Sequence, residues 1–172
     1  MPLGKFKEQF LSKNFHKKLK EIPDVRIPIS KEIHSVAILT TDECSKELDL
    51  VSEVKNNFNS VRNVHIYSYR KFKSSDSVTY KHFTERDFDW KGKVKDPSFE
   101  NFLENPFDLL IGYFHEKNLY LEVATLKSNA SFKIGFANVN DKLFDIVVNE
   151  DPVKIDSFIK VIKKYLELLH KI

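Results

Sequence analysis

Glycine and cysteine are both scarce in this chain of 172 residues, which has four glycines and one cysteine. The glycines are Gly4, Gly92, Gly112 and Gly135, and no two of them are close together in the sequence. This spacing excludes the dinucleotide fingerprint and the Walker A loop, because each needs clustered glycines around a phosphate. The lone Cys44 excludes an intramolecular disulfide and every multi-cysteine zinc pattern.

Arginine is also rare, and the basic residues are unevenly placed. The formal net charge is +3. Residues 1–26 contain seven Lys or Arg against three acids, so the remaining body of the chain is close to neutral. The basic character therefore belongs to the N-terminal segment. Because bidentate recognition of phosphate and guanine favours arginine, the composition argues against sequence-specific binding of nucleic acid.

Long apolar runs are missing as well. No stretch approaches the ~20 apolar residues of a membrane span, and the N-terminal lysines precede no apolar run of signal-peptide length. Without an export signal or a disulfide pair, we expect a cytoplasmic protein. The length and the 41% hydrophobic content predict one globular domain.

Residues 1–28 are predicted to form a basic amphipathic helical segment and a linker, separate from a domain at 29–172. Two apolar stripes on different helical faces predict a break near residues 12–14. The first stripe is Leu3, Phe6 and Phe10, and the second is Leu11, Phe15, Leu19 and Ile22. Pro23 and Pro28 are expected to end this region in an extended linker.

The rest of the chain alternates short apolar runs with amphipathic stretches, which predicts a Rossmann-like three-layer α/β sandwich. The expected strands are 35–40, 64–69, 107–114, 132–136 and 144–149. The expected helices are 45–58 with Asp42 as cap, 98–104 after Asp96-Pro97, 118–127 capped by Asn118, and a last helix opened by Asp151-Pro152. Only about seven residues join the last two strands, too few for a parallel crossover, so the last strand of a mostly parallel five-stranded sheet is predicted to be antiparallel. Residues 70–95 receive no assignment.

The segment 107–136 (FDLLIGYFHEKNLYLEVATLKSNASFKIGF), with Asp89-Trp90-Lys91-Gly92 before it, resembles a family of small flavobacterial proteins known only as a domain of unknown function. The resemblance runs the full length of the chain. It implies a bacterial, cytoplasmic α/β protein and brings no activity or site residues.

A more distant similarity concerns glycosyl transfer. The run 108–111, followed by 128–130 and 133–136, is similar to the N-terminal half of heptosyltransferase-type glycosyltransferases. Those enzymes bind the sugar nucleotide mainly through a second domain, which this chain lacks. The glycine-containing loop after their first strand is replaced here by Thr40-Thr41-Asp42-Glu43. We therefore interpret the similarity as one of fold.

Open α/β sheets bind ligands beyond the carboxyl ends of their strands, where the strand order reverses. If the first and third strands flank that point, the loops 40–44 and 112–118 face each other. The candidate binding residues are Thr40, Thr41, Asp42, Glu43, Gly112, His115 and Glu116. Such a mixture suits acid–base chemistry near neutral pH. The alternative is structural: Asp42 as a helix cap and His115-Glu116 as a solvated turn.

No cofactor or metal is expected from the remaining polar residues. Cys44 near a helix N-terminus is a candidate nucleophile if His65 or His115 lies beside it, and otherwise a small, partly buried residue. The six histidines show no HxH or HExxH spacing, which disfavours a metal site. His16 and His170 lie in lysine-rich helices, where we expect them on the surface.

Aromatic residues supply the last candidates. Trp90, with Tyr80, Phe83 and Phe88, either lines a ligand cleft or anchors a long connection onto the core. The N-terminal segment either packs on the domain or on a second copy, or contacts a partner. An anionic membrane, with Phe6, Phe10 and Phe15 inserted, and an RNA bound by lysines are the open alternatives.

These observations favour a non-catalytic binding or interaction module with the basic N-terminal helix as contact element. The partner is then an unknown protein or a second copy of the chain, and a peripheral membrane contact stays open. The alternative is a small enzyme that binds a nucleotide or a sugar phosphate at the loops after the first and third strands.

Overall fold

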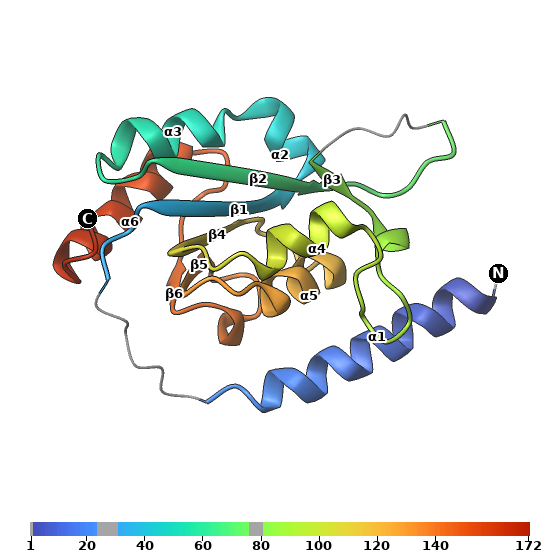
Figure 1. Ribbon diagram of the computed structural model, residues 1–172. Coiled ribbons are helices and arrows are strands. Elements are labelled where there is room, and N and C mark those ends of the chain that lie inside the picture. The colour runs from blue at the N-terminus through green and yellow to red at the C-terminus, as the bar shows by residue number, and fades with distance from the viewer. Residues whose placement is uncertain (1, 24–30, 76–80) are drawn as a thin grey trace.

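The centre of the molecule is a six-stranded sheet with the order β3-β2-β1-β4-β5-β6, in which every pairing is parallel. The computed structural model describes residues 2–23, 31–75 and 81–172 (Figure 1). The strands are β1 (Ser35–Thr41), β2 (Asn63–Tyr69), β3 (His82–Phe83), β4 (Leu109–Tyr113), β5 (Phe132–Phe136) and β6 (Ile146–Val148). The predicted α/β class is confirmed.

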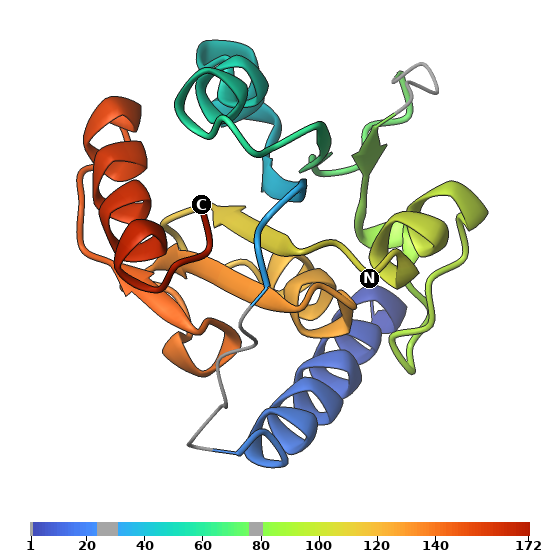
Figure 2. The same ribbon diagram turned by 60° about the vertical axis from the view of Figure 1, so that its left-hand side comes forward.

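Helices cover both faces of the sheet, as the two views in Figures 1 and 2 show. They are α1 (Pro2–Lys20), α2 (Asp42–Glu47), α3 (Leu50–Asn57), α4 (Pro97–Glu104), α5 (Leu119–Lys127) and α6 (Ile155–Leu168), with 3-10 turns η1 (Glu85–Asp87) and η2 (Asp141–Leu143). One apolar core lies between the sheet and α1, α4 and α5. The second lies between the sheet and α3 and α6.

The strands are apolar runs because they are buried on both faces, as parallel strands generally are. In β1 the side chains alternate between the two cores: Ala37 and Leu39 join the first, and Val36 and Ile38 the second. This period of two follows from the pleat of the strand.

Helix caps explain why several predicted boundaries are right. Asp96 accepts a hydrogen bond from the backbone N–H of Phe99 at 2.7 Å, and Pro97 takes the first helical position of α4. The Asn118 side chain likewise caps α5. An oxygen at the cap satisfies an N–H group that has no partner within the helix.

The predicted antiparallel last strand is wrong: β6 pairs parallel to β5, with Ile134 opposite Ile146, and β3 makes the strands six rather than five. The connection is short because it needs no full helix to cover the sheet. The 3-10 turn η2 and Phe144 take that place. Phe144 packs directly over Gly112 and Gly135, neighbours on β4 and β5 that have no side chains to hold it away.

Two helix predictions are also wrong. The expected helix 45–58 is two helices, α2 and α3, because Thr41 caps the first and Asp49 caps the second. The Thr41 side chain, rather than Asp42, accepts the capping hydrogen bond.

In the N-terminal segment, α1 is one helix without a break at 12–14. No break is needed, since Phe6 and Phe10 of the first apolar stripe stay outside the core. The last helix begins at Ile155, three residues after Pro152.

Candidate functional site

The strand order reverses between β1 and β4, which pair with each other directly. This is the arrangement that the predicted loop site requires. However, the two threonines after β1 serve the fold. The Thr40 hydroxyl, fully buried, donates to the carbonyl oxygen of Tyr113 at 2.8 Å and ties β1 to β4. The Thr41 hydroxyl caps α2.

Asp42 turns away from β4 and toward β3. Its Oδ2 accepts from Lys46 Nζ at 2.6 Å, and its Oδ1 lies 3.7 Å from His82 Nδ1. Those last two atoms are buried and have no hydrogen-bond partner among the described residues. Burial lowers the pKa of His82, Asp42 raises it less, and Arg70 adds to the lowering. Glu43 is exposed.

The residues after β4 form a separate group. His115 Nε2 lies 3.9 Å from Glu116 Oε1, and the Glu116 side chain is 88% exposed. Gly112 is covered by the Phe144 ring, which would stand 2.8 Å from a Cβ at that position. Among the described residues, no hydrogen bond or ion pair joins Asp42 to His115 or Glu116. The residues predicted to carry out acid–base chemistry thus form two separate groups at this edge of the sheet.

Cys44 is partly buried, and its backbone N–H caps onto Thr41. His65 is exposed and packs its ring against Phe107. Within residues 2–23, 31–75 and 81–172, no three His, Cys, Asp or Glu side chains are placed to hold a metal ion. None of the helices in those ranges is both long and apolar enough to cross a membrane.

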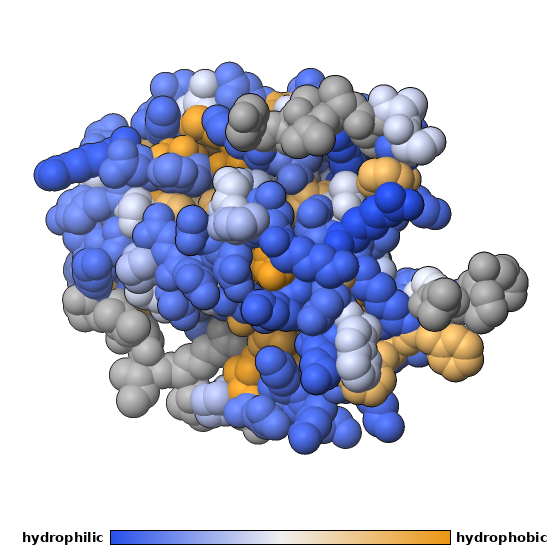
Figure 3. All heavy atoms as spheres, turned by 45° about the vertical axis from the view of Figure 1, so that its right-hand side comes forward, coloured by the Kyte–Doolittle hydropathy of each residue, from blue (hydrophilic) through white to orange (hydrophobic). Residues whose placement is uncertain are grey.

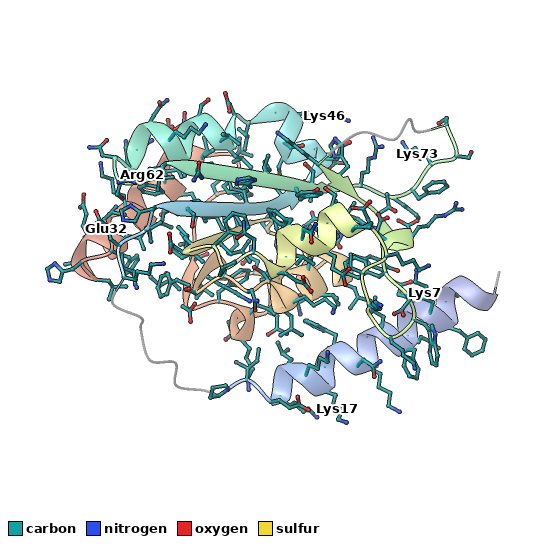
Figure 4. The ribbon with its side chains drawn as sticks, viewed as in Figure 1. Lys7, Lys17, Glu32, Lys46, Arg62 and Lys73 are labelled. Atoms are coloured by element: carbon teal, nitrogen blue, oxygen red, sulfur yellow. The ribbon has the colours of Figure 1, made fainter. Side chains whose placement is uncertain are left out.

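Helix α1 presents two opposite stripes. The inner stripe, which is Leu11, Phe15 and Leu19, is buried in the first core. The outer stripe is Phe6, Phe10, Lys13, Lys17 and Lys20, which fall within about 80° of arc at ~100° per residue. Its centre lies on the opposite side of the helix from the inner stripe. Figure 4 shows Lys17 pointing away from the sheet.

The outer stripe carries two exposed phenylalanines, Phe6 at 68% and Phe10 at 41% exposure. Trp90, exposed at 52%, comes from a different part of the chain and contacts Phe10, with ring centroids 4.9 Å apart. We call these three side chains the aromatic cluster. In Figure 3, apolar atoms project from the surface at the lower right among hydrophilic ones.

A tight turn places Trp90. The Asp89 carboxylate accepts from the backbone N–H groups of Lys91 and Lys93 at 2.8 and 2.7 Å, and closes the turn around Trp90. Gly92 has φ +83°, a conformation that other residues rarely adopt. A Cβ on Gly92 would stand 3.0 Å from Leu11 Cδ1, so the missing side chain also lets the turn sit against α1.

Lysines surround the aromatic cluster. Lys7 Nζ donates to the carbonyl oxygen of Glu85 at 2.6 Å and fixes α1 beside the η1 turn. Among the lysine side chains of α1, only that of Lys7 has a hydrogen bond or ion pair to another described residue. Burial lowers the pKa of Lys7, and the nearby Lys95 lowers it further. The other α1 lysines, and Lys91 next to Trp90, are exposed.

The structure divides the predicted aromatic candidates. Phe83 and Phe88 are fully buried and anchor the 81–95 connection on the core. Trp90 does not anchor this connection, because about half of its side chain is exposed. Phe15 is buried and is not available for insertion into a membrane. Tyr80 lies outside the described residues. His82 and the Phe10–Trp90 contact were missed, although Asp89 and Gly92 three residues apart signal a turn.

A comparison with family models now adds one fact: the model of DUF6913, a family of unknown function, matches residues 7–169. The chain belongs to this family. The match begins one residue after Phe6 and includes Phe10, Trp90 and all of α6. Neither the curated proteins nor the solved structures gave a match. The DUF6913 family brings no activity, so the surfaces above must carry the argument for function.

Proposed function

We propose that this DUF6913 protein is a non-catalytic binding module, and that its contact surface is the outer stripe of α1 together with Trp90. The Phe10–Trp90 contact carries this proposal. It assembles an exposed aromatic surface from two segments 80 residues apart in the chain. Exposed apolar clusters ringed by polar residues are typical of interaction sites, whereas single exposed apolar residues are ordinary.

Specific structure holds this surface in place. The inner stripe fixes one side of α1 on the core, and the Asp89 turn presents Trp90 beside it. A prearranged surface loses little side-chain freedom on binding, which favours association. The division of the predicted acid–base residues between two groups supports a binding role over a catalytic one.

Photo-crosslinking tests the proposal in cells that naturally make the protein. A benzoylphenylalanine replaces Phe10 in one variant and the exposed Arg62 in another. Figure 4 shows Arg62 at the end of the sheet away from Lys7 and Lys17. We expect a discrete crosslinked species from position 10 and none from position 62. Equal crosslinking from both positions, or no crosslink from position 10 to a protein, a nucleic acid or a lipid, would contradict the proposal.

Point variants are the right companion to this test, because deletion of residues 1–26 would remove Leu11, Phe15 and Leu19 and expose the part of the first core that they cover. The double variant Phe6→Ala/Phe10→Ala leaves the inner stripe untouched. We expect the double variant to keep the wild-type melting temperature. It should compete poorly with the crosslinking chain for their common partner. A double variant that competes as well as the wild-type chain would argue against this contact surface.

A second candidate function is the binding of a phosphate-bearing small molecule. The observation that favours it is the buried pair Asp42 Oδ1 and His82 Nδ1, for which the described part of the chain supplies no hydrogen-bond partner. His82 also lines a cavity of about 480 Å³, together with Lys46 and Lys81. Buried polar groups without partners are rare and are often found at functional sites. The position differs from the predicted loops, since it lies over β2 and β3.

A thermal-shift screen with nucleotides and sugar phosphates tests this candidate. A ligand at a hundred times its dissociation constant stabilises the fold by ~2.7 kcal/mol, or roughly 5–10 °C for a chain of this size. We expect the shift to disappear in Lys46→Ala and in His82→Ala. A flat screen removes the candidate, as does a shift that both variants retain.

A further inference from the structure

We propose that the outer stripe of α1 and Trp90 bind the surface of an anionic lipid membrane. This inference rests on the proposed function, since it names the partner of the same surface. Three observations carry it: the kind of apolar side chain that is exposed, the charge around it, and the way α1 is held on the domain.

The exposed apolar residues are of the kind that enters a lipid interface. Tryptophan and phenylalanine have large apolar rings, and tryptophan adds an N–H group that stays near water. Phe10 contacts Trp90, Phe6 lies one helical turn before Phe10 on the same stripe, and all three side chains are exposed. Interfacial helices carry such residues on the face that enters the boundary between headgroups and acyl chains.

The charge around the aromatic cluster is positive on balance, although the carboxylates of Glu85, Asp87 and Asp89 act on Lys7 from nearby. Helix α1 contains six lysines against the single acid Glu8. Lys13, Lys17 and Lys20 continue the same stripe as the two phenylalanines, and Lys91 lies 5.1 Å from the centre of the Trp90 ring. Lysine stems can lie along apolar surface while the ammonium group meets a phosphate. This charge also opposes self-association through the stripe, because two copies would bring the same lysines together.

The arrangement suits a membrane better than a protein or a nucleic acid. Protein interfaces are depleted in lysine and favour arginine, and no arginine occurs in α1. The scarcity of arginine also disfavours guanine recognition. Polybasic segments with apolar anchors, by contrast, bind anionic membranes through two weak signals that act together.

The fold orients the helix for this contact. Since Leu11, Phe15 and Leu19 fix one side of α1 to the core, the helix cannot roll, and the opposite side faces outward. Figure 1 shows α1 along the outside of the molecule. The helix is thus held ready to lie flat on a surface, with the Phe6 end and the lysine end of the outer stripe in contact at once.

The chain contains its own probe, because Trp90 is its only tryptophan. The experiment titrates the full chain with vesicles of phosphatidylcholine, alone or with about a third phosphatidylglycerol, and follows the Trp90 emission. We expect a blue shift with anionic vesicles, a loss of emission when the acyl chains carry bromine, and reversal by salt. Zwitterionic vesicles should produce none of these changes.

Two variants, each with a matched control, distinguish this contact from nonspecific electrostatic or hydrophobic binding. Phe6→Ala/Phe10→Ala should weaken binding to anionic vesicles about ten-fold or more, whereas Val153→Ala/Leu168→Ala, which removes exposed apolar residues elsewhere, should not. Lys13→Gln/Lys17→Gln/Lys20→Gln should weaken it further, at about five-fold per lysine. Removal of Lys160, Lys163 and Lys164 from α6 makes the same change in net charge and should have little effect.

The outcomes distinguish this inference from the proposed function. An unchanged Trp90 emission in anionic vesicles at low salt overturns the lipid proposal, as does equal weakening by the α6 lysine variant. If position 10 still crosslinks to a protein or an RNA in cells, the contact surface stands and its partner is not lipid. If neither vesicles nor crosslinking involve position 10, both proposals fail.

Discussion

Phe144 lies directly on Gly135, so closely that a Cβ built on the glycine would stand 2.3 Å from Phe144 Cζ. Carbon atoms that are not bonded to each other do not approach that near, so any larger residue at position 135 has to move the ring or the strand. The same ring covers Gly112, the neighbour of Gly135 on the next strand. Two of the four glycines of the chain therefore serve one aromatic ring, which lets a 3-10 turn replace a crossover helix.

Gly135→Ala should lower the free energy of unfolding by about 1–3 kcal/mol, because overpacking strains a filled core. Phe144→Leu in the same chain should restore part of that loss, which a double-mutant cycle in urea would measure. Gly4→Ala is the control: nothing lies within 4 Å of its Cβ, so no loss is expected there. Additive effects of the two core changes would contradict the contact.

The two stripes of α1 should respond differently to truncation. Phe15→Ala should cost about 3–5 kcal/mol, since the ring is 3% exposed within the first core. Phe6→Ala should stay within about 0.5 kcal/mol, because its ring lies in solvent. Urea unfolding of the full chain measures both. A small loss of unfolding free energy in Phe15→Ala would mean that α1 does not share the core of the domain.

Asp108 should make stability depend on acid. Burial raises its pKa, but the Lys31 ammonium, the N–H groups of His34 and Ser35 and the Ser35 hydroxyl together lower it to about 2. A carboxyl with a depressed pKa stabilises the fold above its unfolded value and loses that effect as the pH falls through its folded value.

Asp108→Asn should therefore cost about 1–3 kcal/mol at neutral pH, from the lost charge-assisted hydrogen bonds. The difference from the wild type should shrink between about pH 4 and pH 2. Melting temperatures across that range measure it, with the exposed Glu104→Gln as control. A difference that does not change with pH would assign the loss to packing instead.

The ionised carboxylate of Glu122 should lower stability at neutral pH, whereas that of Asp108 raises it. Burial in α5 raises its pKa, and the hydrogen bond from the Asn140 backbone N–H only partly offsets this. A raised pKa favours folding while the carboxyl is protonated, and this advantage is lost as the pH rises through the folded value. Glu122→Gln keeps an acceptor and removes the buried charge, so it should raise the melting temperature at neutral pH.

The control for that change is Glu116→Gln, whose side chain is almost fully exposed. The gain from Glu122→Gln should diminish as the pH is lowered toward the ordinary range of glutamic acid, where the wild type carries the proton itself. A destabilised Glu122→Gln at neutral pH would show that the buried carboxylate is well paired.

Local signals in the sequence were sufficient for most of the sheet and the capped helices. The apolar runs predicted β1, β2, β4 and β5, and Asp96-Pro97 and Asn118 predicted the starts of α4 and α5. A strand at 144–149 was predicted as well, but its parallel direction could not be found this way, because it depends on Gly112 and Gly135 meeting under Phe144. β3 has two residues and gives no periodic pattern.

The surfaces were harder to predict than the fold. Lysines and phenylalanines predicted the N-terminal helix as a contact element, but a single helical wheel could not decide which phenylalanine is buried. Phe15 and Phe10 differ only in which side of α1 meets the core. The contact of Phe10 with Trp90 joins distant segments, as does that of Asp42 with His82. No short-range pattern reports either pair.

The position of β1 at the middle of the sheet has a consequence for synthesis. β1 pairs with β2 on one side and with β4 on the other, and Ser35 meets Asp108 across 73 residues of sequence. A ribosome delivers β1 and β2 long before β4. During that interval the emerging chain offers an open strand edge, which is the kind of surface that recruits other chains. Slow elongation between residues 70 and 108 should therefore increase misassembly in cells, and chaperones that shield strand edges should act in that interval.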